Sequence, residues 1–380
     1  MTGSRMIVVM LIAALMFATN TGAAAVTEDV TFIGSYDTGI AKHVAVSGDY
    51  AYVIDDTNGL VIVDISDKDT PVVVGSYGAV DDARYVAVSG NYAYVADKRE
   101  GLVIVDVSDK EAPVRIGICA VRGSAYSVVV SGDYAYVADH KNGLVVVDIS
   151  DAEAPVFVGR YSIARDTYGV TVSDNYAYLV DYNNGLVVVN VSIKEEPVLA
   201  GSYDVKGWSV GVAVSGDYAY VANDVNGLAI VDIGDVEAPV LAGTYDTTAH
   251  VETVIMSGDY AYVTDMDNGL AIVDIGDAEA PVLAGSYDTE GDAHAVAVSG
   301  DYAYVADGGN GLVILHVGTG ITTPTTTPTR VATAASRETA TSLETMQTAT
   351  KSAASEGSGF GGVFAVAGLL AIAYLVRRQR

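Results

Sequence analysis

Residues 44–77 read VAVSGDYAYVIDDTNGLVIVDISDKDTPVVVGSY, and this stretch decides the fold. The same pattern returns along the chain, and the glycine of its closing Gly-Ser-Tyr-type triplet recurs after 41 residues and then every 42 residues. These glycines are Gly34, Gly75, Gly117, Gly159, Gly201, Gly243 and Gly285. A repeat of about 40 to 50 residues with strand-like content indicates the blades of a β-propeller.

Each unit contains four short runs that favour β-strands. In the first full copy they are residues 44–46, 50–53, 60–63 and 72–77. A Ser-Gly-Asp-Tyr turn follows the first run and suits a two-residue hairpin, and an Asn-Gly pair precedes the third run where positive φ is expected. Four strands joined by short turns predict one blade per unit.

The ends of the array predict how the ring closes. The first three strands of the unit occur seven times, but the first copy of the fourth strand, residues 31–36, precedes all the others. The last unit stops at Gly318 without a fourth strand. An N-terminal strand that completes the last blade removes an open sheet edge. We therefore expect an all-β, seven-bladed β-propeller over residues 26–318, closed by its N-terminal strand.

Three segments lie outside the repeats. Residues 1–25 combine a basic start, an apolar run and a small-residue end, which is typical of a signal peptide. Residues 319–358 are rich in Thr, Ser and Pro and predict a disordered stalk open to O-glycosylation. Residues 359–380 hold an apolar run followed by three arginines, which predicts a transmembrane segment with a cytoplasmic basic tail.

Two motifs resemble known families. The Gly-Leu-Val-Ile-Val-Asp segments at residues 59–64 and 101–106, with variants in later units, resemble LVIVD-repeat proteins. This resemblance implies β-propellers of archaeal and bacterial surfaces, and it brings no catalytic motif. The run at residues 358–361, Ser-Gly-Phe-Gly, resembles the archaeal PGF-CTERM sorting signal, with Ser358 where that signal has Pro. It implies an archaeal source, tail removal and a lipid-linked end.

These features together predict the location of the protein. We expect it on the extracellular face of the cell membrane, secreted through the signal peptide and anchored at its C-terminus by the membrane segment or by a lipid. The chain has 48 acidic and 20 basic residues and a net charge of −28, which argues against nucleic acid as a partner. Its single cysteine, Cys119, forms no internal disulfide, and we expect it to be a buried packing residue.

The repeats distinguish two faces of the expected propeller. Strand direction alternates within a blade, so the turns after the first and third strands share one face, which we call the bottom. These turns barely change between units, which indicates a scaffold. The connections after the second and fourth strands diverge, and they share the opposite face, the top. Divergent loops on a rigid scaffold are where recognition usually lies.

One top-face position, two residues before each innermost run, is expected to surround the mouth of the central channel. It is occupied by Lys42, Arg84, Tyr126, Tyr168, Val210, Glu252 and His294. Trp208 lies two residues before Val210 in sequence. We take Trp208 and the ring residues except Val210 as the candidate ligand-binding residues. The rings of Tyr126, Tyr168 and Trp208 are suited to stacking on sugars, or alternatively to packing within the loops.

The sequence offers no cofactor or metal signature. No nucleophile elbow, phosphate loop, zinc motif or dinucleotide fingerprint is present, so we assign no catalytic residue and no cofactor. Four top-face residues from adjoining blades lack metal-ligand spacing, and we expect no metal there. They are His43, His250, Glu252 and His294. Asn190, in the sequence Asn-Val-Ser, is a glycosylation candidate on the bottom face.

Three functions remain open at this point. We expect a non-catalytic, surface-anchored propeller that binds an extracellular glycan or envelope protein, in adhesion or in scaffolding of an S-layer-type envelope. The alternative is an extracellular hydrolase or lyase that acts on polysaccharide or peptide at the top mouth, with Glu252, Asp292 or His294 controlling turnover. A third hypothesis is a purely architectural envelope component held by its acidic faces.

Overall fold

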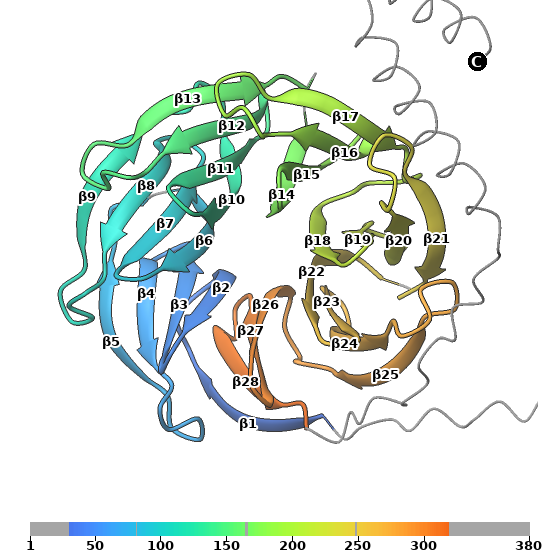
Figure 1. Cartoon of the computed structure of the whole chain (residues 1–380). Helices are drawn as coiled ribbons and strands as arrows, with labels where there is room; N and C mark the ends of the chain where they lie inside the picture. The colour runs from blue at the N-terminus through green and yellow to red at the C-terminus, as the bar shows by residue number, and fades with distance from the viewer. Residues whose placement is uncertain (1–29, 81, 164–165, 248, 319–380) are drawn as a thin grey trace, which may run out of the picture. The chain divides into compact units, whose positions relative to one another are not determined.

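The computed structural model describes residues 30–80, 82–163, 166–247 and 249–318. The predicted signal peptide, stalk and membrane segment lie outside these residues. The described chain forms 28 strands in seven four-stranded antiparallel sheets around a central opening (Figure 1). Within the described ranges, no helix is long and apolar enough to cross a bilayer. The predicted seven-bladed, all-β propeller is confirmed.

The first blade shows the plan that the others repeat. It contains β2 (Ala41–Ser47), β3 (Tyr50–Asp55), β4 (Gly59–Asp64) and β5 (Val72–Tyr77). The strands pair in chain order, with β2 at the central opening and β5 on the rim (Figure 1). The Ser-Gly-Asp-Tyr turn joins β2 to β3, and its glycine, Gly48, has a φ of 59° with nothing within 4 Å of an added Cβ. The turn chemistry therefore sets the blade register, with Ser47 opposite Tyr50.

Five further blades follow the same order. The second contains β6 (Ala83–Ser89), β7 (Tyr92–Asp97), β8 (Gly101–Asp106) and β9 (Val114–Cys119). The third contains β10 (Ala125–Ser131), β11 (Tyr134–Asp139), β12 (Gly143–Asp148) and β13 (Val156–Tyr161). The fourth contains β14 (Thr167–Ser173), β15 (Tyr176–Asp181), β16 (Gly185–Asn190) and β17 (Val198–Tyr203). The fifth contains β18 (Gly211–Ser215), β19 (Tyr218–Ala222), β20 (Leu228–Asp232) and β21 (Val240–Tyr245). The sixth contains β22 (Val251–Ser257), β23 (Tyr260–Asp265), β24 (Gly269–Asp274) and β25 (Val282–Tyr287).

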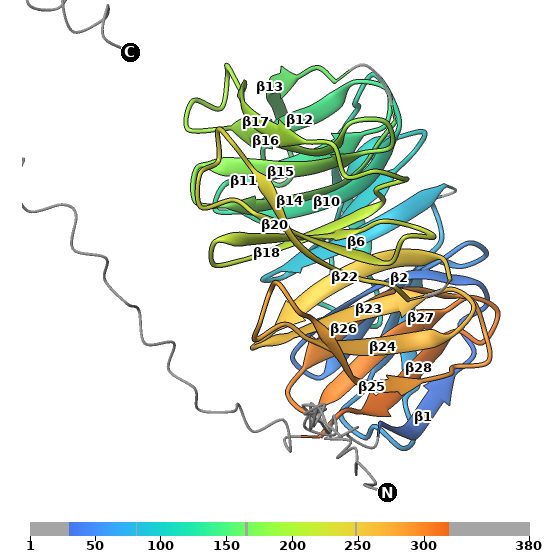
Figure 2. The same cartoon turned by 90° about the vertical axis from the view of Figure 1, so that its right-hand side faces the viewer.

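The seventh blade combines the two ends of the array. Its strands are β26 (Ala293–Ser299), β27 (Tyr302–Asp307), β28 (Leu312–His316) and β1 (Thr31–Tyr36). β1 pairs antiparallel with β28, from Thr31 opposite His316 to Tyr36 opposite Leu312. Both views of the molecule show β1 beside β28 (Figures 1 and 2). The N-terminal strand thus closes the ring, as the order of the repeats predicts.

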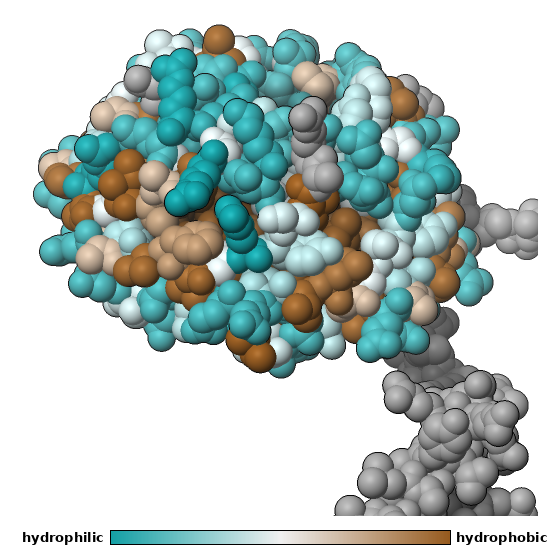
Figure 3. All heavy atoms as spheres, turned by 90° about the horizontal axis from the view of Figure 1, so that it is seen from above, coloured by the Kyte–Doolittle hydropathy of each residue, from teal (hydrophilic) through white to brown (hydrophobic). Residues whose placement is uncertain are grey.

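The hydrophobic core is divided among the junctions between neighbouring blades. Seven clusters of buried side chains occupy these junctions, and each contains a tyrosine from a second strand, such as Tyr52, Tyr136 or Tyr304. Cys119 is buried in one of these clusters, as the sequence predicts. Apolar side chains also emerge among polar ones on the rim, where the outer strands leave one edge open (Figure 3).

Two further features bring the blades close together. The bottom-face lysines lie across blade junctions, and the Lys110 ammonium is 5.4 Å from the ring centroid of Tyr50 in the preceding blade. The glycine of the repeated triplet faces the backbone of the next blade. A Cβ on Gly201 would overlap the carbonyl oxygen of Val236, closer than real Cβ atoms approach. The repeated glycine therefore follows from blade packing rather than from turn geometry.

Candidate functional site

The innermost strands surround a pocket of about 270 Å³ on the propeller axis. The seven ring positions all line it, which confirms that they converge. They are Lys42, Arg84, Tyr126, Tyr168, Val210, Glu252 and His294. Trp208 does not line this pocket. The walls are chemically uneven, because the cations come from the first two blades and the tyrosines from the next two.

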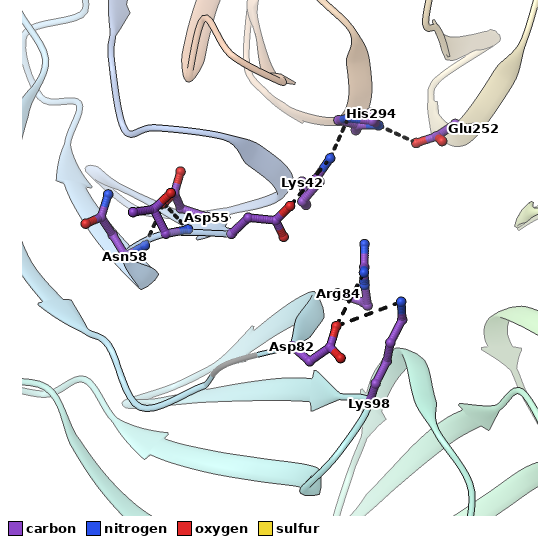
Figure 4. A network of polar contacts seen from close by, with 10 residues as sticks. Lys42, Asp55, Asn58, Asp82, Arg84, Lys98, Glu252 and His294 are labelled. Carbon is purple, nitrogen blue, oxygen red and sulfur yellow. Dashed lines mark hydrogen bonds and ion pairs between the residues drawn. The ribbon is translucent and has the colours of Figure 1, made fainter.

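Three cations surround one carboxylate on the cationic side. Asp82 Oδ1 accepts a hydrogen bond from Arg84 Nη2 at 3.3 Å and lies 3.9 Å from Lys98 Nζ. The other oxygen of Asp82 lies 3.5 Å from Arg99 Nε. Figure 4 shows the Arg84 and Lys98 side chains beside Asp82, and Lys42 reaching toward His294. Lys42 and Arg84 line the pocket, whereas Lys98 does not. Cations are therefore gathered at this wall, although the whole chain is strongly acidic.

A buried aspartate holds this wall in place. Asp97 ends β7, is fully buried, and accepts the backbone N–H groups of Arg99 at 2.8 Å and of Asp82 at 3.1 Å. It thus ties the top hairpin to the connection that carries Asp82. Every blade repeats a buried residue here, as Asp55, Asp97, Asp139, Asp181, Asn223, Asp265 and Asp307. Sequence reasoning missed this role, although the available signal was an Asp that recurs at one position of every unit except the fifth blade's, where Asn223 replaces it.

A polar chain crosses the mouth from blade 6 to blade 1. Glu252 Oε2 lies 2.7 Å from His294 Nδ1, and Lys42 Nζ lies 3.1 Å from His294 Nε2 (Figure 4). A lysine ammonium is only a donor, so Nε2 accepts and the ring proton resides on Nδ1, from which it is donated to Glu252. Lys42 is also 3.7 Å from Asp56, so one carboxylate balances its charge.

The wall formed by blades 3 and 4 is aromatic. The rings of Tyr126 and Tyr168 meet edge to face with centroids 5.1 Å apart, and Tyr168 lies 6.2 Å from Tyr182. Tyr182 stacks on Trp208 at 4.9 Å, so this row of rings runs outward from the mouth to a half-exposed tryptophan. Burial raises the pKa of the Tyr168 hydroxyl, with a further contribution from the neighbouring Tyr126. The predicted aromatic arc exists, but Tyr182 links its members and Trp208 stands at its outer end.

The next residue of each innermost strand varies in size, and all of these residues except Ala295 line the pocket. They are His43, Tyr85, Ser127, Gly169, Gly211, Thr253 and Ala295. His43 is buried against Tyr85, with ring centroids 3.6 Å apart, and its Nδ1 accepts the Val86 N–H at 3.4 Å. Burial lowers the pKa of His43 to about 3. Among the residues that the structure describes, no group of three His, Cys, Asp or Glu side chains can hold a metal ion.

His43 predicts a pH dependence of stability. Its pKa is about 3 in the folded chain against an ordinary value of 6.5, so between these values the unfolded chain takes up a proton that the folded chain refuses. Stability should therefore fall as the pH drops below about 6.5. From about pH 7 to about pH 5, this one group should lower the free energy of unfolding by about 2 kcal/mol.

The measurement is urea unfolding of the intact chain at both pH values, compared with His43→Gln. Glutamine keeps an acceptor for the Val86 N–H and does not titrate, so the variant should lose less stability on acidification. The carboxylates are common to both proteins and cancel in the comparison. If the free energy of unfolding fell by the same amount in both proteins, His43 would take up a proton as readily in the folded chain as in the unfolded chain.

Asn190 ends β16 at the bottom face. Its Oδ1 accepts the Ser192 N–H at 2.9 Å and the Ser192 hydroxyl at 2.7 Å. The corresponding aspartates hold the same turn in other blades, as Asp64 does with the Ser66 N–H at 2.8 Å. The sequon therefore lies in a repeated turn, where Asn190 accepts the same backbone N–H as the aspartate of other blades. Its glycosylation remains a prediction.

Comparisons with known proteins bear on the family and the fold. The LVIVD repeat model matches residues 31–79, 81–121, 122–163, 164–205, 206–247, 249–289 and 290–318. The PGF-CTERM motif matches residues 359–379. No curated protein matches the chain.

Among solved structures, similar ones include the propeller domain of Myceliophteria thermophila Cps50 (Swd1), with a TM-score of 0.61 and 15% identity over 76% of this chain and 100% of that one. The WD40 propeller domain of Doa1 has a TM-score of 0.62 and 12% identity over 77% of this chain and 98% of that one. BamB from Moraxella catarrhalis has a TM-score of 0.53 and 13% identity over 77% and 98% of the two chains. At these identities, the likeness concerns the fold alone.

Proposed function

The chain belongs to the family of LVIVD-repeat proteins, and from this premise we propose that its propeller is a recognition module that binds an extracellular ligand at the mouth pocket. The PGF-CTERM motif indicates a C-terminally processed protein anchored at the outer cell surface. A surface-anchored propeller presents its loops to molecules outside the cell. We propose that secretion uses residues 1–25 as a signal peptide, and that the ligand is a glycan or an envelope protein, in adhesion or envelope scaffolding.

The uneven wall of the mouth pocket carries this proposal. The blades are near-identical in their bottom turns, yet the same mouth position holds Lys and Arg in blades 1 and 2, Tyr in blades 3 and 4, and Glu and His in blades 6 and 7. A purely architectural ring has no need for different chemistry at one repeated position. A concave pocket with apolar walls and a few convergent polar groups is the usual form of a small-molecule site.

The test is capture of a ligand by the mouth. The intact chain, immobilised from mild detergent, is exposed to envelope fractions beside the double variant Tyr126→Ala/Tyr168→Ala. Because buried aromatic contacts often contribute at least about 2 kcal/mol to binding, we expect capture to fall by at least about tenfold. Phe157→Ala is the matched control, since Phe157 is an exposed aromatic on the rim strand β13.

Thermal melting of the three proteins checks that they remain folded. Equal capture by the double variant and the unmodified chain would contradict the proposal and favour the architectural hypothesis, with the acidic scaffold as the contact surface. Loss of capture in Phe157→Ala as well would move the contact from the mouth to the rim.

One observation favours a second candidate function. The Glu252–His294–Lys42 chain holds an oriented imidazole at the mouth, and its Nε2 can serve as a general base when a substrate displaces the Lys42 ammonium from it. The alternative is therefore a hydrolase or lyase that acts on polysaccharide or peptide in the same pocket. The decisive measurement is release of reducing ends or peptides from envelope polymers, compared with His294→Asn. Turnover that disappears in the variant would replace recognition with catalysis.

A further inference from the structure

The cationic wall of the mouth identifies the chemical class of ligand, and this inference rests on the proposed function. We propose that the pocket binds the terminal residue of a glycan that carries a carboxylate. The carboxylate contacts Arg84 and Lys42, and the sugar ring lies against Tyr126 and Tyr168.

The first argument is the charge balance at Asp82. Within the described residues, three cations pair with the Asp82 carboxylate: Arg84 at 3.3 Å, Lys98 at 3.9 Å and Arg99 at 3.5 Å. In addition, Arg84 Nε is buried and has no hydrogen-bond partner within the described residues. Asp81 precedes this cluster and lies outside those residues. A guanidinium carries five N–H donors, so the Nη groups of Arg84, which lines the pocket, can still donate to a planar carboxylate there.

The second argument is the contrast with the rest of the molecule. The chain has a net charge of −28, so its general surface repels anions. At the mouth, by contrast, Lys42 and Arg84 line one pocket, and Lys98 lies beside Arg84 at Asp82 (Figure 4). An anionic ligand is therefore attracted to the mouth and repelled elsewhere, which orients it toward the pocket.

The third argument is the orientation that the remaining walls impose. Glu252 lines the pocket on the side away from Arg84, where it repels a carboxylate and accepts hydrogen bonds from hydroxyl groups. The aromatic wall begins directly beside the cationic one, because Lys98 Nζ is 4.7 Å from the Tyr126 ring centroid. A ligand that meets all three walls has a carboxylate at one end, an apolar ring face at the side and hydroxyls at the other end.

The volume of the pocket favours a sugar over a peptide segment. At about 270 Å³ it is at the small end of ligand sites, which usually range from about 300 to 1,000 Å³. One pyranose ring with its carboxylate fits such a space, and the rest of a glycan can extend out of the mouth. Ser127 and Thr253 line the same pocket and add hydroxyl groups that suit a polyhydroxylated ring.

The experiment measures binding of defined probes to the intact chain in detergent micelles by isothermal titration calorimetry. The probes are a glucuronate-terminated disaccharide, its glucose-terminated counterpart and a short oligoglutamate peptide. We expect the acidic disaccharide to bind at least about tenfold more tightly than the neutral one, because hydrogen bonds to a charged group are stronger than those between neutral groups. Added salt should reduce this preference.

Arg84→Gln keeps a hydrogen-bonding side chain and removes the charge, so it should weaken acidic disaccharide binding about ten- to a hundredfold and leave the neutral probe nearly unchanged. Arg115→Gln is the matched control, because Arg115 lies on the rim strand β9 and pairs with Glu100 at 3.0 Å. Equal binding of the two disaccharides, or no effect of Arg84→Gln, would overturn the inference. Preference for the peptide would overturn it in favour of an acidic protein partner.

The outcomes also separate this inference from the proposed function. Suppose that the neutral disaccharide binds, that Tyr126→Ala abolishes this binding and that Arg84→Gln has no effect. Recognition at the mouth then stands, but the ligand needs no carboxylate. Absence of binding by all three probes overturns the glycan assignment, and mouth-dependent capture from envelope fractions then decides whether recognition stands. The same comparison also tests whether Asp81 neutralises the charge of Arg84. In that case the chain would not prefer the acidic disaccharide over the neutral one.

Discussion

A chain that lacks residues 26–36 should melt at least about 10 °C below the intact protein, or fail to accumulate folded, because a single kcal/mol shifts the melting temperature of a large domain by about 2–4 °C. β1 provides the whole outer partner of β28, from Thr31 to Tyr36. Its loss removes a row of backbone hydrogen bonds, each contributing about 0.5–1.5 kcal/mol, and also the apolar contacts of Ile33 with the junction between blades 7 and 1. It further turns β28 into an exposed edge strand.

Rescue in trans makes this prediction specific. A synthetic peptide with the sequence of residues 30–37 should bind the shortened chain by strand addition and restore much of the lost melting temperature. A peptide of scrambled sequence is the control. Differential scanning calorimetry with and without peptide provides the measurement. An unchanged melting temperature in the shortened chain would show that the ring is held without β1.

Substitution of Gly201 by valine should destabilise the propeller by about 1–3 kcal/mol or more, because overpacking at a rigid contact forces the backbone to move. The Cβ of any larger residue would overlap the Val236 carbonyl oxygen of the next blade, and a carbonyl within a turn cannot rotate away as a side chain can. The two blades must then separate. Urea unfolding of Gly201→Val against the unmodified chain measures the loss.

Gly309→Val supplies the matched control for this prediction. Gly309 is exposed, and an added Cβ meets nothing within 4 Å. Its backbone is outside the positive-φ set, so a side chain brings no conformational strain there. We expect this variant to unfold within about 0.5 kcal/mol of the parent chain, as typical surface substitutions do. Equal losses at both sites would indicate a general penalty for replacing glycine rather than a blade contact.

The architecture could be predicted from the sequence because the repeat makes each local signal occur several times. A single Ser-Gly-Asp-Tyr turn is weak evidence, but the same turn in every unit, with strand-like runs at a constant spacing, leaves few alternatives. The displaced copy at residues 31–36 predicted the closing strand for the same reason. Repetition also predicted that the seven ring positions surround one opening, since equivalent positions of a ring share one radius.

The chemistry of the mouth could be predicted only in outline. Which residues face the channel follows from strand order, but which of them pair depends on rotamers and on distances of a few ångström. The shared carboxylate of Asp82 lies outside the ring position, and it reaches the cations because Asp97 holds its backbone. Trp208 and Tyr168 lie at the top face of neighbouring blades, but the ring of Tyr182 lies between their rings. Such contacts have no periodic signature.

The position of β28 also has a mechanical consequence. A protein attached to a surface through residues near 359–379 transmits any pull on its ligand into the chain just after His316, the last residue of β28. That strand lies between β27 and β1, so a tug at its end acts on two ladders of hydrogen bonds at once. A propeller closed in chain order would place a rim strand there, held on one side and open to peeling. Because β1 pairs with the outer edge of β28, the strand that receives the pull is held on both sides within a sheet.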